Sequence, residues 1–168
     1  MDITWTYWKP SESVTSKSVV GVCTASEHEL QCEINSYPDE VTAKEDIEKL
    51  IEWALNNEED VKRHILERHY FDIIWICHLY EAEGSVESAD ELRALAGDGQ
   101  NIGVEPFASR ESMTRHLKLS QIVRDYEYDG FLLQFVPTEA ELTSNMGGHG
   151  PSVSIGDDFS VGEFDWSG

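Results

Sequence analysis

Alternating hydrophobic and polar positions near the N-terminus predict three short strands. In the first of them, Ile3, Trp5 and Tyr7 fall on one side, and Lys9-Pro10 ends the run. The second and third strands flank a polar stretch and predict a hairpin with one solvated face. The three strands cover residues 2–8, 19–23 and 30–35.

The predicted hairpin brings two of the three cysteines near each other. A turn centred on Glu27 and His28 places Cys23 opposite Cys32, close enough for a disulfide. The third cysteine is Cys77, and neither the odd number nor the spacing resembles the disulfide framework of a secreted protein. Reduced, buried thiols are therefore the default expectation, and the redox state of the first two stays open.

The middle of the chain follows a helical period. Thr42 and Glu45 have the spacing of a capping box and predict a helix over 42–55. Asn57, followed by three acidic residues, predicts the start of a second helix over 57–69. In 70–80 both alternating sets are largely apolar, so this run is either a strand buried on both faces or a continuing buried helix.

Capping and turn residues mark the remaining elements. Ser88 and Glu91 predict a short helix that Gly97 ends. Asp129-Gly130 is a favourable turn dipeptide for a hairpin. The other expectations are a strand over 102–107, a helix over 113–123, hairpin arms within 126–136, and a tail or edge hairpin rich in Gly and Asp over 145–168.

These elements together predict an α+β fold with a mostly antiparallel sheet, built from N-terminal and C-terminal hairpins around a helical middle. At 168 residues, the length suits a single domain. We expect the domain to cover 1–144 and the tail or edge hairpin to cover 145–168.

The net charge is the strongest indication of which partners the protein binds. There are 33 acidic against 12 basic residues, a formal net charge of -21. This balance argues against direct binding to nucleic-acid phosphates or anionic lipid, because such contacts need local positive charge. No run of about 18 apolar residues and no basic, hydrophobic leader is seen, so we expect a cytoplasmic protein that does not contact a membrane.

The charge is unevenly placed along the chain. Residues 26–60 hold 12 acids and 2 bases, and 125–168 hold 9 acids and no Lys or Arg. The basic cluster of the chain lies between these zones, on the outer face of the predicted helix, at Arg110, Arg115, Lys118 and Arg124.

A chain of this mass exposes roughly 8,000 Å², so the average is about one net charge per 400 Å². Duplex DNA carries about one per 100 Å². A local, protein-directed contact therefore fits this density better than mimicry of a whole duplex.

Catalytic and metal-binding motifs are not expected to carry the function. No G-x-S-x-G, P-loop or dinucleotide-binding glycine pattern occurs. Asp125, Glu127 and Asp129 resemble the opening of a calcium loop, but Val136 stands where the closing glutamate belongs. We expect no catalytic residues, no metal and no cofactor.

The leading hypothesis is a non-catalytic, acidic inhibitor that binds and occludes a basic partner protein. The partner class is a nuclease-type toxin, so that this chain would be an immunity protein or antitoxin, or a related anti-defence protein. Two alternatives are a nucleic-acid mimic that blocks restriction or CRISPR machinery, and an acidic enzyme or structural domain with a salt-adapted surface. The candidate partner-binding residues are Glu45, Glu48, Glu52, Glu58, Glu59 and Asp60 in the first acidic zone and Asp157, Asp158, Phe159, Glu163, Phe164, Asp165 and Trp166 in the tail.

The tail has two readings. Carboxylates interleaved with aromatic side chains can anchor a partner. Alternatively, Phe159 and Trp166 cover the protein's own core as part of a last strand.

Overall fold

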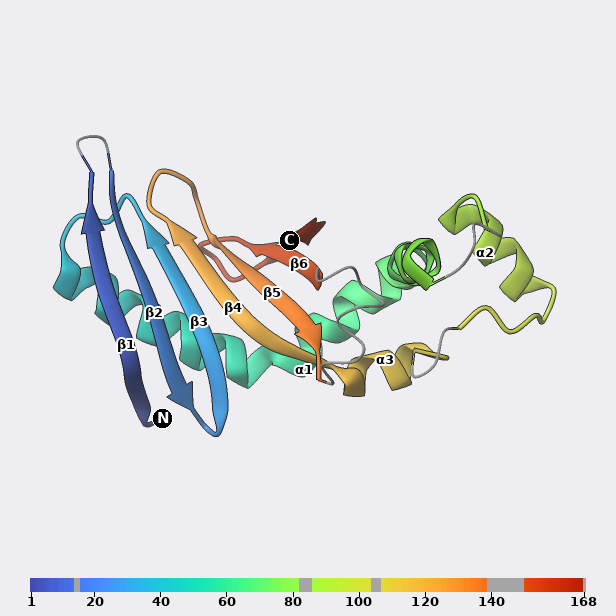
Figure 1. Ribbon diagram of the computed structural model, residues 1–168, viewed down its shortest axis with the longest axis horizontal. Helices are drawn as coiled ribbons and strands as arrows, with labels where there is room; N and C mark the ends of the chain where they lie inside the picture. Colours follow the sequence, from blue (N-terminus) through green and yellow to red (C-terminus); the bar gives the residue numbers. More distant parts are fainter. Residues whose placement is uncertain (14–15, 82–85, 104–106, 139–149, 168) are drawn as a thin grey trace. The chain divides into compact units, whose positions relative to one another are not determined.

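The computed structural model describes residues 1–13, 16–81, 86–103, 107–138 and 150–167. It shows the α+β fold expected, with one long helix, two short helices and a mostly antiparallel sheet whose strand order is β1-β2-β3-β4-β5-β6-β7 (Figure 1). One pair of neighbours, β3 and β4, is parallel. The elements are β1 (Ile3–Glu12), β2 (Lys17–Ala25), β3 (His28–Asn35), α1 (Glu40–Glu81), α2 (Ala89–Gly97), α3 (Arg110–His116), β4 (Leu117–Asp125), β5 (Phe131–Pro137), β6 (Gly150–Ile155) and β7 (Val161–Ser167).

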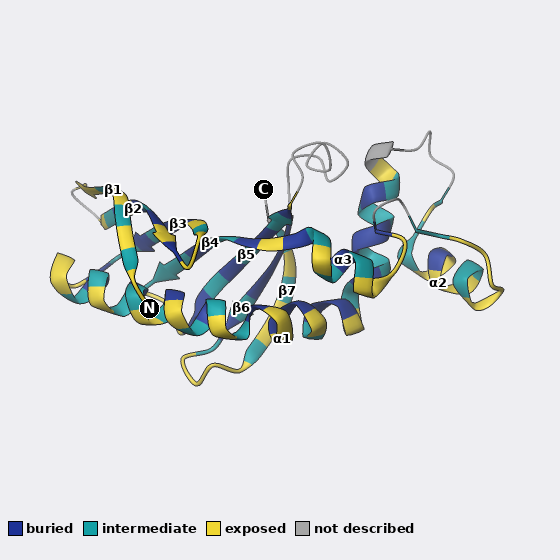
Figure 2. Ribbon diagram, turned by 90° about the horizontal axis from the view of Figure 1, so that it is seen from below, coloured by how far each residue is buried: buried dark blue, intermediate teal, exposed yellow. Residues whose placement is uncertain are grey.

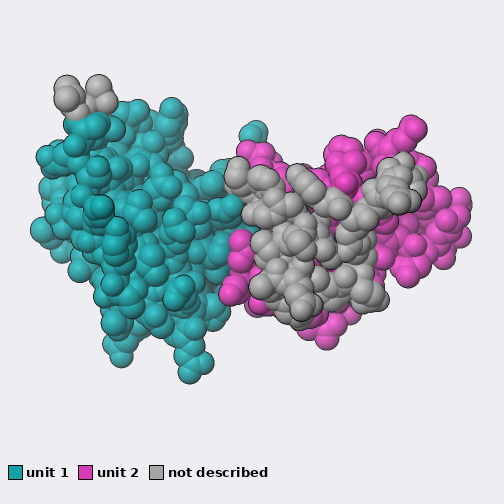
Figure 3. All heavy atoms as spheres, in the orientation of Figure 1, with its two compact units in different colours: residues 1–58, 119–135, 152–163 teal, residues 59–118, 136–151, 164–168 magenta. Residues whose placement is uncertain are grey.

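The chain forms two compact units, each assembled from several segments. Unit 1 comprises 1–58, 119–135 and 152–163, and unit 2 comprises 59–118, 136–151 and 164–168 (Figure 3). In unit 1 the first half of α1 runs along one face of the N-terminal strands (Figure 1). Ile47 and Ile51 of α1 and Leu30 and Ile34 of β3 are all buried. In unit 2 the buried side chains include Leu66, Ile73, Leu92, Phe107 and Met113 (Figure 2).

β1 is longer than expected and has a bulge. It pairs with β2 through Glu12, past Pro10, which an edge strand tolerates because its outer side forms no ladder hydrogen bonds. The register shifts between Trp5 and Tyr7, so Thr6 is the extra residue. The prediction that Tyr7 shares a face with Trp5 is therefore wrong: Tyr7 is 47% exposed, and Trp8 takes the inner position instead.

The β2–β3 hairpin is confirmed, but its predicted register is wrong. The two-residue turn is Ser26-Glu27, both at positive φ (48° and 69°), which is the conformation that matches the twist of the strands. Cys23 consequently pairs with Leu30, whereas Cys32 pairs with Gly21. None of the three cysteines forms a disulfide, and all three are buried; a hydrogen bond to Cys23 together with burial raises the pKa of the Cys32 thiol.

α1 is a single helix, so the prediction of a second helix beginning at Asn57 is wrong. The Asn57 side chain donates to the carbonyl oxygen of Trp53, four residues earlier, instead of capping a new N-terminus. The run 70–80 continues the helix, and the strand alternative is wrong. Buried positions repeat at intervals of three and four throughout, at 47, 51, 54, 58, 62, 66, 70, 73 and 77.

The N-cap of α1 also differs from the predicted capping box. Asp39 is the capping residue: its carboxylate accepts hydrogen bonds from the backbone N–H of Thr42 (2.9 Å) and from the Thr42 hydroxyl (2.7 Å). These bonds lower the pKa of Asp39 because they stabilise the charged form.

The helix predicted over 88–97 is confirmed, with Ser88 as N-cap. The helix predicted over 113–123 is wrong beyond His116, where the chain becomes β4. β4 buries Leu117, Leu119 and Ile122, and it is a strand because residues 121–125 pair with β3. Of the strand predicted over 102–107, positions 104–106 lie outside the described residues, and the flanking positions are not in a strand.

The predicted basic cluster is not one surface within a unit. Arg110, in unit 2, donates to the Leu66 carbonyl oxygen and stacks its guanidinium over Tyr70 and Phe71. Arg124, in unit 1, is bound by Asp157 (3.0 Å) and by the carbonyl oxygen of Gly130.

A second hairpin ends in the predicted Asp129-Gly130 turn and its second arm, β5, is confirmed, but the prediction of its first arm is wrong: residues 126–128 lie in the turn, and the arm is β4, which ends at Asp125. β4 and β5 are neighbours joined through Asp129-Gly130, where Gly130 has a positive φ of 83°. β6 pairs antiparallel with β5, and β6 and β7 are neighbouring strands. Of the expected tail, residues 145–149 lie outside the described part of the chain.

Candidate functional site

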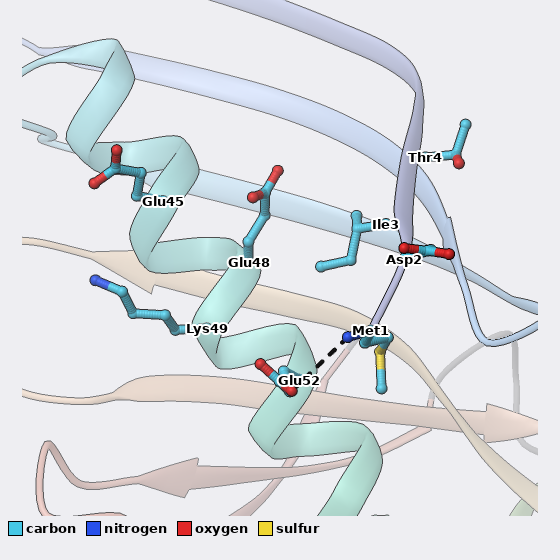
Figure 4. Close-up of a pocket in the computed structure, with 8 residues that line it drawn as sticks. All are labelled: Met1, Asp2, Ile3, Thr4, Glu45, Glu48, Lys49 and Glu52. Atoms are coloured by element: carbon cyan, nitrogen blue, oxygen red, sulfur yellow. Dashed lines mark ion pairs between the residues drawn. The ribbon is translucent and has the colours of Figure 1, made fainter.

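An open acidic pocket of about 740 Å³ lies in unit 1, between the first half of α1 and the start of β1 (Figure 4). Glu45, Glu48 and Glu52, three of the predicted binding residues, line it from α1, because positions three and four apart share one face of a helix. The strand side contributes Met1, Asp2, Ile3 and Thr4, and Lys49 completes the lining.

A second pocket of about 620 Å³ adjoins the first. It is lined by Glu40, Val41, Lys44, Glu45 and Glu48, and shares two glutamates with its neighbour. We call the combined surface the acidic groove and define it by Asp2, Glu40, Glu45, Glu48 and Glu52. The groove therefore presents five carboxylates, four of them along about three turns of helix and one, Asp2, just before β1.

Two tryptophans of β1 hold carboxylates of the groove in place. The indole N–H of Trp5 donates to Glu48 Oε1 (2.7 Å), and that of Trp8 donates to Glu40 Oε1 (2.8 Å). The rings meet edge to face, with centroids 4.7 Å apart and planes at 78°. Gly21 leaves room for them, since a Cβ there would come within 2.5 Å of the Trp5 ring. The bulge at Thr6 is what places both indoles on the face toward α1.

Cations of the chain itself lie against the groove. The ammonium of Lys44 is 5.9 Å from the Trp5 ring centroid and 5.7 Å from that of Trp8. The amino group of Met1 is 4.0 Å from Glu52 Oε1 (Figure 4). Lys49 pairs with Asp46 at 3.2 Å. The groove attracts positive groups, as its density of carboxylates requires.

Asp46 connects α1 to the β4–β5 turn within unit 1. Its Oδ2 accepts a hydrogen bond from the Tyr126 hydroxyl at 2.9 Å. Burial, and then this bond to a carboxylate, raise the pKa of Tyr126 to about 12. The contact braces the helix segment that carries the groove.

The other predicted acids of the first zone have different surroundings. Glu58 is buried (8% exposed); its Oε1 accepts from the backbone N–H of Leu119 at 2.9 Å, and Oε2 lies 3.8 Å from His28. Glu59 and Asp60 belong to unit 2, where they pair with Lys62 (2.5 Å) and Arg63 (2.9 Å). Among the six predicted acids of this zone, the structure brings three together in the groove.

The first part of the tail forms a tight turn between β6 and β7. Asp157 accepts from Arg124 and from the backbone N–H of Gly130, each at 3.0 Å. Asp158 accepts from the backbone N–H of Ser160 at 3.0 Å, and the Ser160 bonds lower the pKa of Asp158. Both carboxylates are thus engaged in shaping the turn.

Phe159 stands at the tip of this turn with a positive φ of 62° and is 43% exposed. One side of its ring stacks on Trp53, with centroids 4.9 Å apart, and it meets Phe131 edge to face at 6.2 Å. The ring therefore packs on the protein's own core on one side, and the reading of Phe159 as a partner anchor stays a prediction.

The end of the tail is divided between the units. Glu163 is exposed in unit 1, where its backbone bonds the Ser154 hydroxyl. Phe164, in unit 2, stacks on His69 (4.4 Å, 11°), and the Asp165 carboxylate accepts from the backbone N–H of Trp166. The tail residues do not gather on one surface within a unit.

For metal binding and for catalysis, the part of the chain that the structure describes shows no matching group of side chains. No group of three His, Cys, Asp or Glu residues there is placed to hold a metal ion. Asp125 and Asp129 lie at the β4–β5 turn, where the Asp125 carboxylate accepts from the Glu127 N–H. His69 pairs with Asp72 (3.1 Å) one helical turn away, and its ring is covered by Phe164.

Sequence reasoning missed the tryptophans and Lys44. A strict alternation from Ile3 assigns Trp8 to the outer face, and the bulge that reverses this has no marker in the sequence. A usable signal was present: two indoles in one short strand need acceptors for their N–H groups, and a glutamate-rich helix is a source of acceptors.

No family model matches this chain, and neither a curated protein nor a solved structure shows significant similarity to it. None of the helices in the described ranges is long and apolar enough to cross a membrane.

Proposed function

We propose that this chain is a non-catalytic, acidic inhibitor that acts in the cytoplasm by binding a basic protein. The partner class is a nuclease-type toxin, with this chain as its immunity protein or antitoxin, or a host defence enzyme that this chain blocks. The observation that carries the proposal is the acidic groove, in which carboxylates of α1 and of Asp2, which precedes β1, surround open pockets beside two indole rings.

The groove has the physical properties that recognition of a cationic cleft requires. Hydrogen bonds from Trp5 and Trp8 pre-orient two carboxylates, which lowers the entropy lost on binding. The indoles add apolar contact area of the kind that dominates binding energy at interfaces. The negative field steers a basic partner and raises the association rate toward about 10⁸ M⁻¹s⁻¹ at low ionic strength.

Contacts within unit 1 favour the groove over the tail as the principal interface. Asp157 and Asp158 are already bonded inside the β6–β7 turn, so recruiting them would break existing bonds. Phe159 remains available as an aromatic contact, because close to half of its surface is exposed.

The charge density favours a local contact over imitation of a nucleic acid. The accessible surface is 9240 Å², so a net charge of -21 amounts to about one charge per 440 Å². Duplex DNA carries about four times more, one per roughly 100 Å². A compact cationic cleft is a better match than a DNA-binding channel.

The test begins with capture of the partner from an extract of the native host, followed by mass spectrometry and an assay of that partner's activity. The groove variant Glu45→Gln, Glu48→Gln, Glu52→Gln removes three negative charges without changing side-chain size. The matched control is Glu27→Gln, Glu29→Gln, Glu127→Gln, which removes three exposed charges elsewhere in unit 1.

We expect the groove variant to bind and inhibit the partner at least about 10-fold less well, since each interfacial charge contributes roughly 0.5–1 kcal/mol. The control variant should stay within about 2-fold of the parent, and parent affinity should fall as ionic strength rises. Equal losses in both variants, or affinity that is independent of salt, would contradict the proposal.

A further inference from the structure

The corner between Trp5 and Trp8 has the features of a receptor for one positively charged side chain. Two indole rings meet edge to face with their planes at 78°, and each indole N–H fixes a glutamate beside it. Cations bind over indole faces within about 6 Å of the ring centroid. The combination of two rings and two carboxylates is therefore more specific than a patch of negative charge.

The cation now at this corner is the chain's own Lys44. Its ammonium lies 5.9 and 5.7 Å from the two ring centroids, at the outer limit of the favourable range, so both contacts are loose. Lys44 is one helical turn from Glu40 and from Glu48, on the same stripe of α1. An ammonium held loosely over two rings, on a helix stripe that also carries Glu40 and Glu48, marks the position that a cation prefers.

We propose that an arginine of the partner takes this corner and displaces Lys44, which acts in the free protein as an internal substitute for the partner's cation. The inference rests on the proposed function and names the group that the groove recognises. It assigns Trp5 and Trp8 as stacking surfaces and Glu40 and Glu48 as hydrogen-bond acceptors.

The geometry favours a guanidinium over an ammonium. A guanidinium is planar, stacks on an indole face, and presents paired N–H donors to a carboxylate, whereas an ammonium acts as a point charge. A carboxylate accepts about four hydrogen bonds, so Glu40 and Glu48 retain capacity after accepting one from an indole. The adjoining pocket of about 620 Å³, with the exposed Val41 at its edge, has room for the arginine stem.

Lys49 provides a matched control because it is the other lysine that lines the two pockets. It pairs with Asp46 and is not over the rings. Lys44→Met and Lys49→Met each remove one positive charge from the same groove, so general electrostatics raises the affinity for a cation similarly in both. Only Lys44→Met vacates the indole corner.

The probe is the peptide acetyl-Gly-Arg-Gly amide, with the citrulline and lysine versions as comparisons. Binding is measured from the indole N–H resonances in ¹⁵N-labelled protein, after assignment by Trp→Phe variants whose fold is checked by circular dichroism. We expect the arginine peptide to shift Trp5 and Trp8 and to leave Trp53, Trp75 and Trp166 nearly unchanged. Lys44→Met should tighten binding about 5-fold, an effect of the size of one cation–π contact, and Lys49→Met less than about 2-fold.

Equal tightening in the two lysine variants would overturn the proposal, as would equal shifts with the citrulline peptide or no shift with any. Lysine peptide binding as tightly as arginine would overturn the choice of a guanidinium. These outcomes are separate from the test of the proposed function. If the groove variant loses the partner while both lysine variants behave alike, the inhibitor proposal stands and the arginine site is refuted. If the peptide results are as expected and the groove variant keeps the partner, the arginine site stands and the inhibitor proposal is refuted.

Discussion

Replacing Gly21 with alanine should disturb the acidic groove, because the added methyl group would displace the Trp5 ring. A Cβ at this position would lie 2.5 Å from Cζ3 and 3.1 Å from Cε3 of Trp5, and 3.1 Å from Cε3 of Trp8. Carbon atoms in contact are normally about 3.5–4.0 Å apart, so the Trp5 ring must move by about 1 Å.

That displacement has two energetic consequences. Overpacking of this kind costs about 1–3 kcal/mol, with the lower end expected here because Trp5 is half-buried and its ring can shift toward solvent. The movement also stretches the 2.7 Å bond to Glu48, which contributes about 1 kcal/mol where water can replace it. We expect Gly21→Ala to lower the free energy of unfolding by about 2 kcal/mol.

The assay is urea unfolding followed by far-ultraviolet circular dichroism, for Gly21→Ala, Trp5→Phe and the double variant. Phenylalanine lacks the outer ring atom that the new methyl group meets, so in the Trp5→Phe background the alanine should cost less than about 0.5 kcal/mol. An equal cost of Gly21→Ala in both backgrounds would refute the reasoning, because the clash with the indole would then not be its source.

Two further predictions concern unit 1. Gly130→Ala should destabilise the protein by at least about 2 kcal/mol in urea unfolding, because it combines a positive φ with a methyl group directed at the Ile155 carbonyl oxygen; Gly99→Ala, with a φ of 77° and open space around it, should cost only about 1 kcal/mol. Equal costs would contradict the steric argument. Tyr126→Phe should remove the tyrosine that titrates near pH 12 in absorbance at 295 nm. Since the folded-state pKa of Tyr126 is above its unfolded value of about 10, its contribution to stability is present below pH 10 and lost as the pH rises toward 12, and the parent should lose stability faster than the variant over that window.

Local patterns were sufficient for the elements whose side chains alternate or repeat without interruption. The helix beginning after Ser88 was predicted because its capping residues stand next to a regular hydrophobic run. Alternation on both arms predicted the β2–β3 hairpin, although not its turn, and Asp129-Gly130 predicted the turn before β5, although not the strand that precedes it. The sequence does not predict the continuity of α1, because Asn57 followed by three acids is also the pattern of a helix start. Only the structure shows that the Asn57 side chain donates to the Trp53 carbonyl oxygen in the preceding helical turn. Likewise, 117–125 contains apolar residues at both helical and strand spacing, and pairing with β3 selects the strand.

The same division applies to the candidate site. The positions of Glu45, Glu48 and Glu52 predict one acidic helical face, because the period of an α-helix depends on backbone geometry alone. Their meeting with Trp5 and Trp8 depends on a bulge at Thr6, a glycine at position 21 and the packing of α1 on β1, which join residues about 40 positions apart.

By itself, then, the amino-acid sequence determined the class of fold, the acidity and the helix face on which three of the carboxylates lie. Only the tertiary structure decided which of the acids are open to a partner and which are used internally: Glu58 is buried against Leu119, Asp157 holds Arg124, and Glu48 lines a pocket with an indole beside it. The physical reason is range. Charge and periodicity are properties of neighbouring residues, whereas burial and hydrogen-bond partners are set by segments that meet only when the chain folds.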